Sequence, residues 1–123
     1  MHWKQYNMYL KSGRTWLFLS YIFIVLYLSA KSGDELGWFS QLWKYDKVVH
    51  FIEYLGVGFL LINAIKIQPL RETHWKYAVC FLLIFPMFDE VLQYFIPTRI
   101  PDIMDLIADI FGGLTGAYIR KYF

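Results

Sequence analysis

Ionisable and hydrogen-bonding side chains gather in three short clusters that interrupt otherwise apolar stretches of this chain. The clusters cover residues 46–54, 88–93 and 99–109. An ionisable side chain at the centre of a membrane helix costs roughly 2.5–3.5 kcal/mol on insertion scales. We therefore expect these residues to carry out acid–base chemistry or to bind a charged ligand.

The residue types in the clusters divide into two sets. Candidates for general acid or base chemistry are one imidazole and four carboxylates, namely His50, Glu53, Glu90, Asp105 and Asp109. Candidates for binding a ligand are Lys47, His50, Tyr54, Gln93 and Arg99. The guanidinium of Arg99 is suited to bidentate contact with a phosphate or carboxylate group. The pattern assigns no residue as a metal ligand.

Each cluster has the spacing of one helix face. Asp46, His50 and Glu53 lie at positions i, i+4 and i+7, which places them on the same side of a helix. One-sided spacing is expected for groups that face an interior cavity. It recurs where Asp89 and Glu90 precede Gln93, and again in Asp102, Asp105 and Asp109.

Two structural interpretations compete with a functional site. Asp102 follows Pro101, and a helix N-cap is the simpler role for Asp102 and a competing role for Asp46. For the other charged residues, the competing interpretation is an ion-pair network that only fastens the helices together.

The composition indicates a membrane protein of one domain, covering residues 1–123. Hydrophobic residues make up 58% of the chain and charged residues 18%, whereas soluble domains average roughly 45–50% and 25%. A net charge of +2 without a basic run gives no reason to expect nucleic acid as a partner. The lone Cys80 excludes a disulfide within the chain and is expected in the core.

Four apolar segments predict an all-α, four-span transmembrane bundle, with spans at 15–30, 48–65, 77–96 and 103–119. The last three can cross a bilayer only if their polar halves face the bundle interior. A soluble four-helix protein is the alternative. Between the first two spans, Ser32 and Glu35 fit a capping box before a short interfacial helix, and a plain loop is its alternative.

Lysine and arginine residues set the expected orientation. An even number of spans places both termini and the loop at 66–76 on one side, with eight Lys and Arg residues against four on the other. The positive-inside rule then places both termini in the cytoplasm. All three polar clusters fall at the opposite, extracytoplasmic end. Within the last span, Gly112 and Gly116 form a small-xxx-small pattern that favours close helix packing.

Three motifs follow one another along the chain: DKxxHFxxY at 46–54, DExxQxFxPxR at 89–99 and DxxxDxxGxxxG at 105–116. In order and separation they resemble the signatures of VanZ-like membrane proteins, over residues 46–116. The chain departs from the family at Asp109, where asparagine is usual. The resemblance implies a small integral protein of the bacterial plasma membrane, linked to the cell envelope and to teicoplanin-type glycopeptide resistance.

Three functions are compatible with these residues. The first is an extracytoplasmic site that binds or processes an anionic envelope lipid or a lipid-linked cell-wall precursor within the bilayer. The second is a non-enzymatic accessory protein with an internal ion-pair network. The third is a metal-dependent membrane enzyme, for which the oxygen-rich set favours Mg²⁺ or Mn²⁺ over zinc. No cofactor is expected, and the sequence indicates neither the oligomeric state nor whether there is catalysis.

Overall fold

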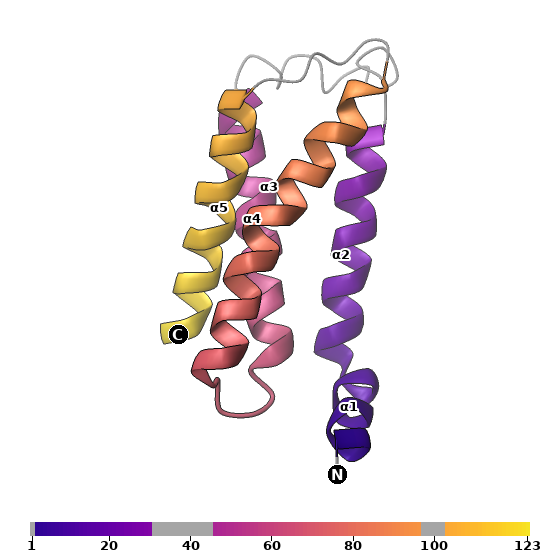
Figure 1. Ribbon diagram of the computed structural model, residues 1–123, viewed down its shortest axis with the longest axis vertical. Helices are drawn as coiled ribbons and strands as arrows, with labels where there is room; N and C mark the ends of the chain where they lie inside the picture. Colours follow the sequence, from indigo (N-terminus) through magenta and orange to yellow (C-terminus); the bar gives the residue numbers. More distant parts are fainter. Residues whose placement is uncertain (1, 31–45, 97–102) are drawn as a thin grey trace.

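The computed structural model describes residues 2–30, 46–96 and 103–123. All the regular structure in these residues is helical, which confirms the all-α prediction (Figure 1). The five helices are α1 (His2–Lys11), α2 (Gly13–Ala30), α3 (Asp46–Ile65), α4 (Glu72–Tyr94) and α5 (Ile103–Tyr122).

Helices α2 to α5 run up and down side by side, and α1 continues below α2 (Figure 1). Both termini and the connection between α3 and α4 lie at one end of the bundle. The ends of α2 and α4 and the starts of α3 and α5 lie at the other. The most extensive helix–helix contact joins α3 to α5, while α2 packs on α3 and α4 packs on both α5 and α2. The described residues of the three polar clusters therefore share one end of the bundle.

The helices differ from the predicted segments in two main respects. Helix α1 was not predicted, because polar and charged residues interrupt its apolar ones and it is polar on average. Helix α4 begins at Glu72 instead of residue 77, which shortens the expected loop. Hydropathy marks only the apolar part of a helix, and Glu72 in the first turn is favourable to the helix dipole. The expected interfacial segment at 31–45, together with Arg99 and Asp102, lies outside the described residues.

Glycines allow the backbones of α3 and α5 to touch. A Cβ atom on Gly112 or Gly116 would overlap with the carbonyl oxygens of Phe51 or Leu55 in α3, and a Cβ atom on Gly58 would overlap with α5. Small residues promote helix association by allowing close approach of this kind. This matters most in a membrane, where burial of apolar side chains contributes little to association. The predicted packing role of Gly112 and Gly116 is therefore confirmed, and Gly58 contributes to it from α3.

Helix α4 bends near its middle, so that its upper half leans toward α2 (Figure 1). The buried Pro86 lies inside this helix and supplies the cause, since proline removes a backbone hydrogen bond and clashes with the preceding turn. Cys80, on the same helix, is exposed. The prediction that Cys80 lies in the core was wrong. The outer surface of the bundle is apolar here, so a small apolar residue fits on it as well as in the core.

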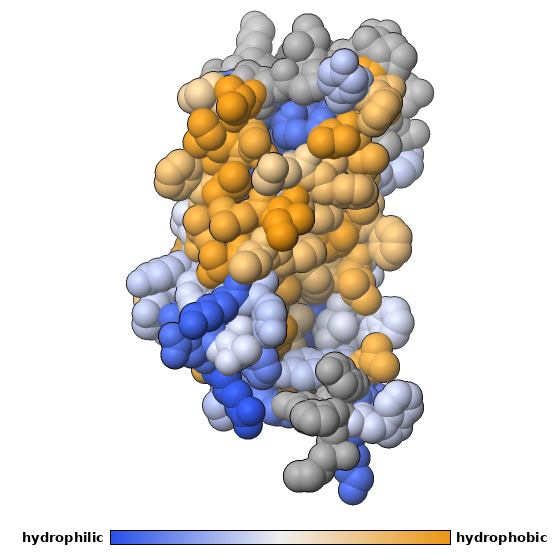
Figure 2. Space-filling model, viewed as in Figure 1, coloured by the Kyte–Doolittle hydropathy of each residue, from blue (hydrophilic) through white to orange (hydrophobic). Residues whose placement is uncertain are grey.

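The face of the bundle seen in Figure 2 is largely apolar over its upper part, and hydrophilic residues gather below, at the end that carries the termini. Large side chains such as Phe23, Ile84 and Phe111 are exposed on three different helices. Among the described helices, only the segment Lys47–Ile65 is both long and apolar enough to cross a membrane by composition. Gly13–Ser29 is apolar but shorter. Helices α4 and α5 carry acidic residues in their polar halves.

We expect Gly116→Ala to destabilise the bundle by ~1–3 kcal/mol, because the added methyl group meets backbone atoms of α3 that cannot rotate away. Thermal unfolding in detergent micelles, followed by circular dichroism, measures the effect. Gly13→Ala is the matched control, since nothing lies within 4 Å of its Cβ position. Equal unfolding temperatures for the two variants would contradict the tight α3–α5 contact.

Candidate functional site

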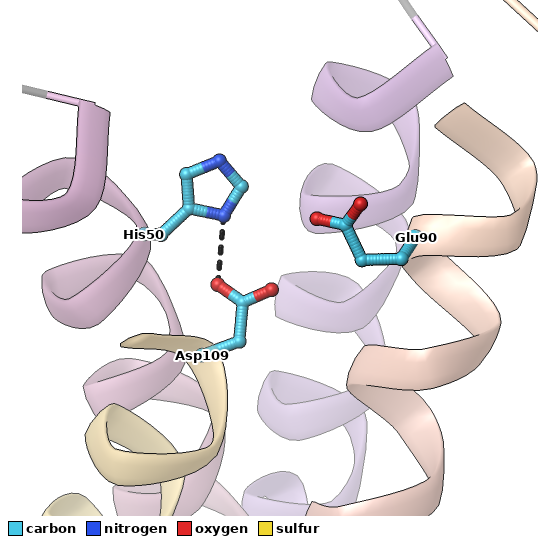
Figure 3. A group of neighbouring side chains, drawn as sticks. All are labelled: His50, Glu90 and Asp109. Carbon is cyan, nitrogen blue, oxygen red and sulfur yellow. Dashed lines mark hydrogen bonds and ion pairs between the residues drawn. The ribbon is translucent and has the colours of Figure 1, made fainter. Parts of the chain in front are cut away.

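A buried histidine–aspartate pair forms the centre of the polar cluster. His50 on α3 lies with its Nδ1 atom 2.7 Å from Oδ1 of Asp109 on α5 (Figure 3). Both residues are buried, Asp109 completely. Phe51, next to His50, touches Gly112, so the glycine contact and the pair lie within one helical turn of each other. The close approach of the two helices thus brings these short side chains within hydrogen-bonding distance.

A second carboxylate extends the pair toward the end of the bundle. Asp105, one turn before Asp109, is buried and places Oδ2 3.8 Å from Nε2 of His50. Its other oxygen accepts a hydrogen bond from Nζ of Lys47 at 3.2 Å. The Lys47 side chain is 49% exposed. A chain of charged groups therefore leads from the surface of the bundle to its interior.

Helix α4 contributes a second buried hydrogen bond. The hydroxyl of Tyr54, on α3, donates to Oδ2 of Asp89 at 2.7 Å. Both residues are almost fully buried, and Tyr54 also packs against the ring of Phe85. This bond joins α3 to the bent helix beyond Pro86. It fixes the part of α4 that carries the remaining acidic residue, Glu90.

Glu90 completes a group of three side chains from three helices. His50, Glu90 and Asp109 each offer a nitrogen or oxygen atom, and these atoms lie within 4.8 Å of one another. Figure 3 shows the three side chains pointing toward a common space from α3, α4 and α5. Both carboxylate oxygens of Glu90 are buried. Such a group can hold a cation or exchange protons, and it lies beneath the end of the bundle.

Acidic groups outnumber basic groups in the described part of this cluster. Four carboxylates accompany one lysine and one histidine, and all but Lys47 have little contact with solvent; the carboxylates belong to Asp89, Glu90, Asp105 and Asp109. Buried negative charge is costly unless protons or cations offset it. The site therefore favours the uptake of positive charge.

Six of the nine candidate residues come together at this site: Lys47, His50, Tyr54, Glu90, Asp105 and Asp109. Gln93 is buried one turn further along α4. Glu53 is half-buried on α3, and its backbone carbonyl accepts a hydrogen bond from Tyr21 at 2.6 Å. Arg99 lies outside the described residues.

Two residues of this region were not among the candidates. Asp89 belongs to the second polar cluster, and its burial against Tyr54 could have been inferred only from the pairing of α3 with α4. Tyr21 on α2 gave no signal, since tyrosine is common in the apolar segments of this chain. Two features of the sequence point to Asp89, namely its i, i+4 spacing from Gln93 and its place at the start of the second motif.

The described residues form a small helical bundle with a buried polar cluster near one end and one helix long and apolar enough to cross a membrane. The sequence profile of the VanZ/LLP1 family matches residues 3–123, essentially the whole chain. The protein therefore belongs to the VanZ/LLP1 family, whose members are membrane proteins linked to glycopeptide resistance. The match extends beyond residues 46–116, where the motifs lie, and includes α1 and α2. No curated protein and no solved structure matches the chain.

We expect Tyr54→Phe to lower stability by ~1.5–3 kcal/mol, because the variant loses a hydrogen bond to a buried carboxylate. The unfolding temperature in detergent measures this loss. Tyr77→Phe is the control, since Tyr77 is an exposed tyrosine on α4. Unchanged stability in Tyr54→Phe would mean that the hydroxyl does not contribute to the contact between α3 and α4.

Proposed function

We propose that this protein is a four-span protein of the bacterial plasma membrane with both termini in the cytoplasm. At its extracytoplasmic end, the polar cluster binds or processes an anionic envelope lipid or a lipid-linked cell-wall precursor. Through that ligand the protein contributes to resistance against glycopeptides of the teicoplanin type. The proposal joins the family membership to the site at one end of the bundle.

The arrangement of the helices supports the topology. Four helices alternate in direction, and the termini share one end (Figure 1). That end carries basic residues, of which Lys66 donates to the last carbonyl groups of α5 and Arg120 donates to Asn63. Basic residues concentrate on the cytoplasmic side of membrane proteins. The clusters are then directed toward the outer leaflet, where cell-wall precursors are used.

The observation that carries the proposed site is the graded burial of its charged groups. From Lys47, 49% exposed, the contacts pass to Asp105 at 7%, to His50 at 6% and to Asp109 at 0%. A lipid headgroup can meet Lys47 at the surface while the acid–base groups lie below it. Figure 2 also shows a small hydrophilic area among apolar side chains near this end of the bundle.

A purely structural role for these residues predicts a different result for their variants. If the contacts only fasten the helices, any loss of resistance in a variant follows its loss of stability. If they form a binding site, resistance falls in variants that stay folded. Resistance and unfolding temperature are therefore measured on the same set of variants.

The topology predicts that a cysteine at position 103 is labelled by a membrane-impermeant maleimide in intact cells and that one at position 72 is not. Ile103→Cys and Glu72→Cys are made in a Cys80→Ser background, since Cys80 is the only native cysteine. Labelling of both variants after the membrane is opened is the control. Labelling of position 72 in intact cells would overturn the orientation.

We expect Glu90→Gln and Arg99→Ala to reduce teicoplanin resistance toward that of cells lacking the protein. Each removes a charge that the proposed site needs, and the minimum inhibitory concentration measures the effect. Glu72→Gln and Arg71→Ala are matched controls, because these exposed residues lie at the opposite end of the bundle. Full resistance in both site variants, at normal protein levels, would refute the proposed function.

A further inference from the structure

An anionic ligand and the described polar site carry the same sign of charge. The lysine and the histidine of the site are outnumbered by carboxylates, and the innermost carboxylate, Asp109, has no contact with solvent. A phosphate or carboxylate headgroup would be repelled from such a place. A divalent cation between the carboxylates and an anionic headgroup would offset this repulsion.

The arrangement of three side chains indicates where that cation binds. Oδ2 of Asp109 is buried and has no hydrogen-bond partner among the described residues. In Figure 3 this oxygen is directed toward Glu90, while the other oxygen contacts His50. The three groups offer atoms within 4.8 Å of one another and come from three different helices. A fully buried carboxylate oxygen without a donor is costly, and a cation in this space would satisfy it.

We propose that His50, Glu90 and Asp109 bind one divalent cation of the hard class, Mg²⁺ or Mn²⁺. Two of the three groups are carboxylates, which suit these ions, and a single imidazole is compatible with manganese. These three residues lie on separate helices and share no local motif, so their sequence spacing does not identify them as metal ligands.

The surroundings of His50 fit a ligand role. Nδ1 faces Asp109, and Nε2 lies 3.8 Å from Oδ2 of Asp105. When one ring nitrogen binds a metal, the N–H of the other is commonly oriented by a carboxylate. Asp105 lies at ion-pair distance from Nε2 and would reach hydrogen-bonding distance after a small shift, and Lys47 in turn holds Asp105.

The role of the cation rests on the proposed function, although its binding does not. Bound between the carboxylates and a headgroup, the cation would present positive charge to the phosphate or carboxylate of an envelope lipid. Lys47 lies on the exposed side of the same group and would contact the outer part of the headgroup. The substrate class is therefore an anionic headgroup bound through a divalent cation.

Manganese binding to the purified protein in detergent micelles tests the cation site directly. Electron paramagnetic resonance reports free Mn²⁺, so titration gives the affinity and the stoichiometry, and Mg²⁺ is added as competitor. We expect one Mn²⁺ per chain in the native protein. Asp109→Asn and Glu90→Gln should each weaken binding by at least ~10-fold. Both substitutions keep the size of the side chain, and unfolding temperatures verify that the variants are folded.

Two control variants sharpen the result. His74→Gln removes a half-buried histidine and Glu72→Gln removes an exposed carboxylate, both at the opposite end of the bundle. Neither should change Mn²⁺ binding. The inference is overturned if the native protein binds no Mn²⁺, or if folded Asp109→Asn and Glu90→Gln bind Mn²⁺ as the native protein does.

The cation site and the proposed function fail in different measurements. Loss of resistance in Glu90→Gln without any Mn²⁺ binding by the native protein would overturn the cation and leave the site function standing. Stoichiometric Mn²⁺ binding that Glu90→Gln abolishes, together with full resistance in that variant, would support the cation site and refute its proposed role.

Discussion

The contact between the backbones of α3 and α5 is the constraint on which the polar site depends. Gly58, Gly112 and Gly116 leave no side chain between the two helices, so carbonyl groups of one helix meet Cα atoms of the other. Histidine and aspartate side chains are short. They reach each other at 2.7 Å only because the helices come this close. A larger residue at these positions would separate the helices and leave two buried ionisable groups apart.

The third helix turns this pair into a site. Helix α4 bends near Pro86 and carries Asp89 and Glu90 just beyond the bend. Tyr54 holds Asp89, which fixes this stretch of α4 against α3 and directs Glu90 toward His50 and Asp109. Because the site is assembled from three helices, a small shift of any one of them would change its geometry. The apolar surroundings strengthen each electrostatic contact within it.

Much of the fold could be predicted from the sequence, since long apolar segments indicate helices by length and hydropathy alone. The ends of the helices could not. Helix α4 extends back to Glu72 and α1 forms before the first apolar segment, and in both places the residues are polar enough to resemble a loop. Helix formation there depends on backbone hydrogen bonds and on contacts with neighbouring helices. The hydropathy of the sequence does not indicate either of these. For the same reason, the exposed place of Cys80 could not be read from its apolar neighbours.

For the candidate site, the sequence by itself determined which helix faces carry the polar groups and that these faces meet at one end of the bundle. Helical periodicity and the alternating direction of the four segments are sufficient to predict both features. The first is a local property of the sequence and the second follows from the topology. Tertiary structure alone decided the partners: His50 with Asp109, Lys47 with Asp105 and Tyr54 with Asp89. Pairing depends on the separation and rotation of packed helices. Glycines and a proline set the separation and rotation of the helices. Their effect on the distance between helices appears only in the packed bundle.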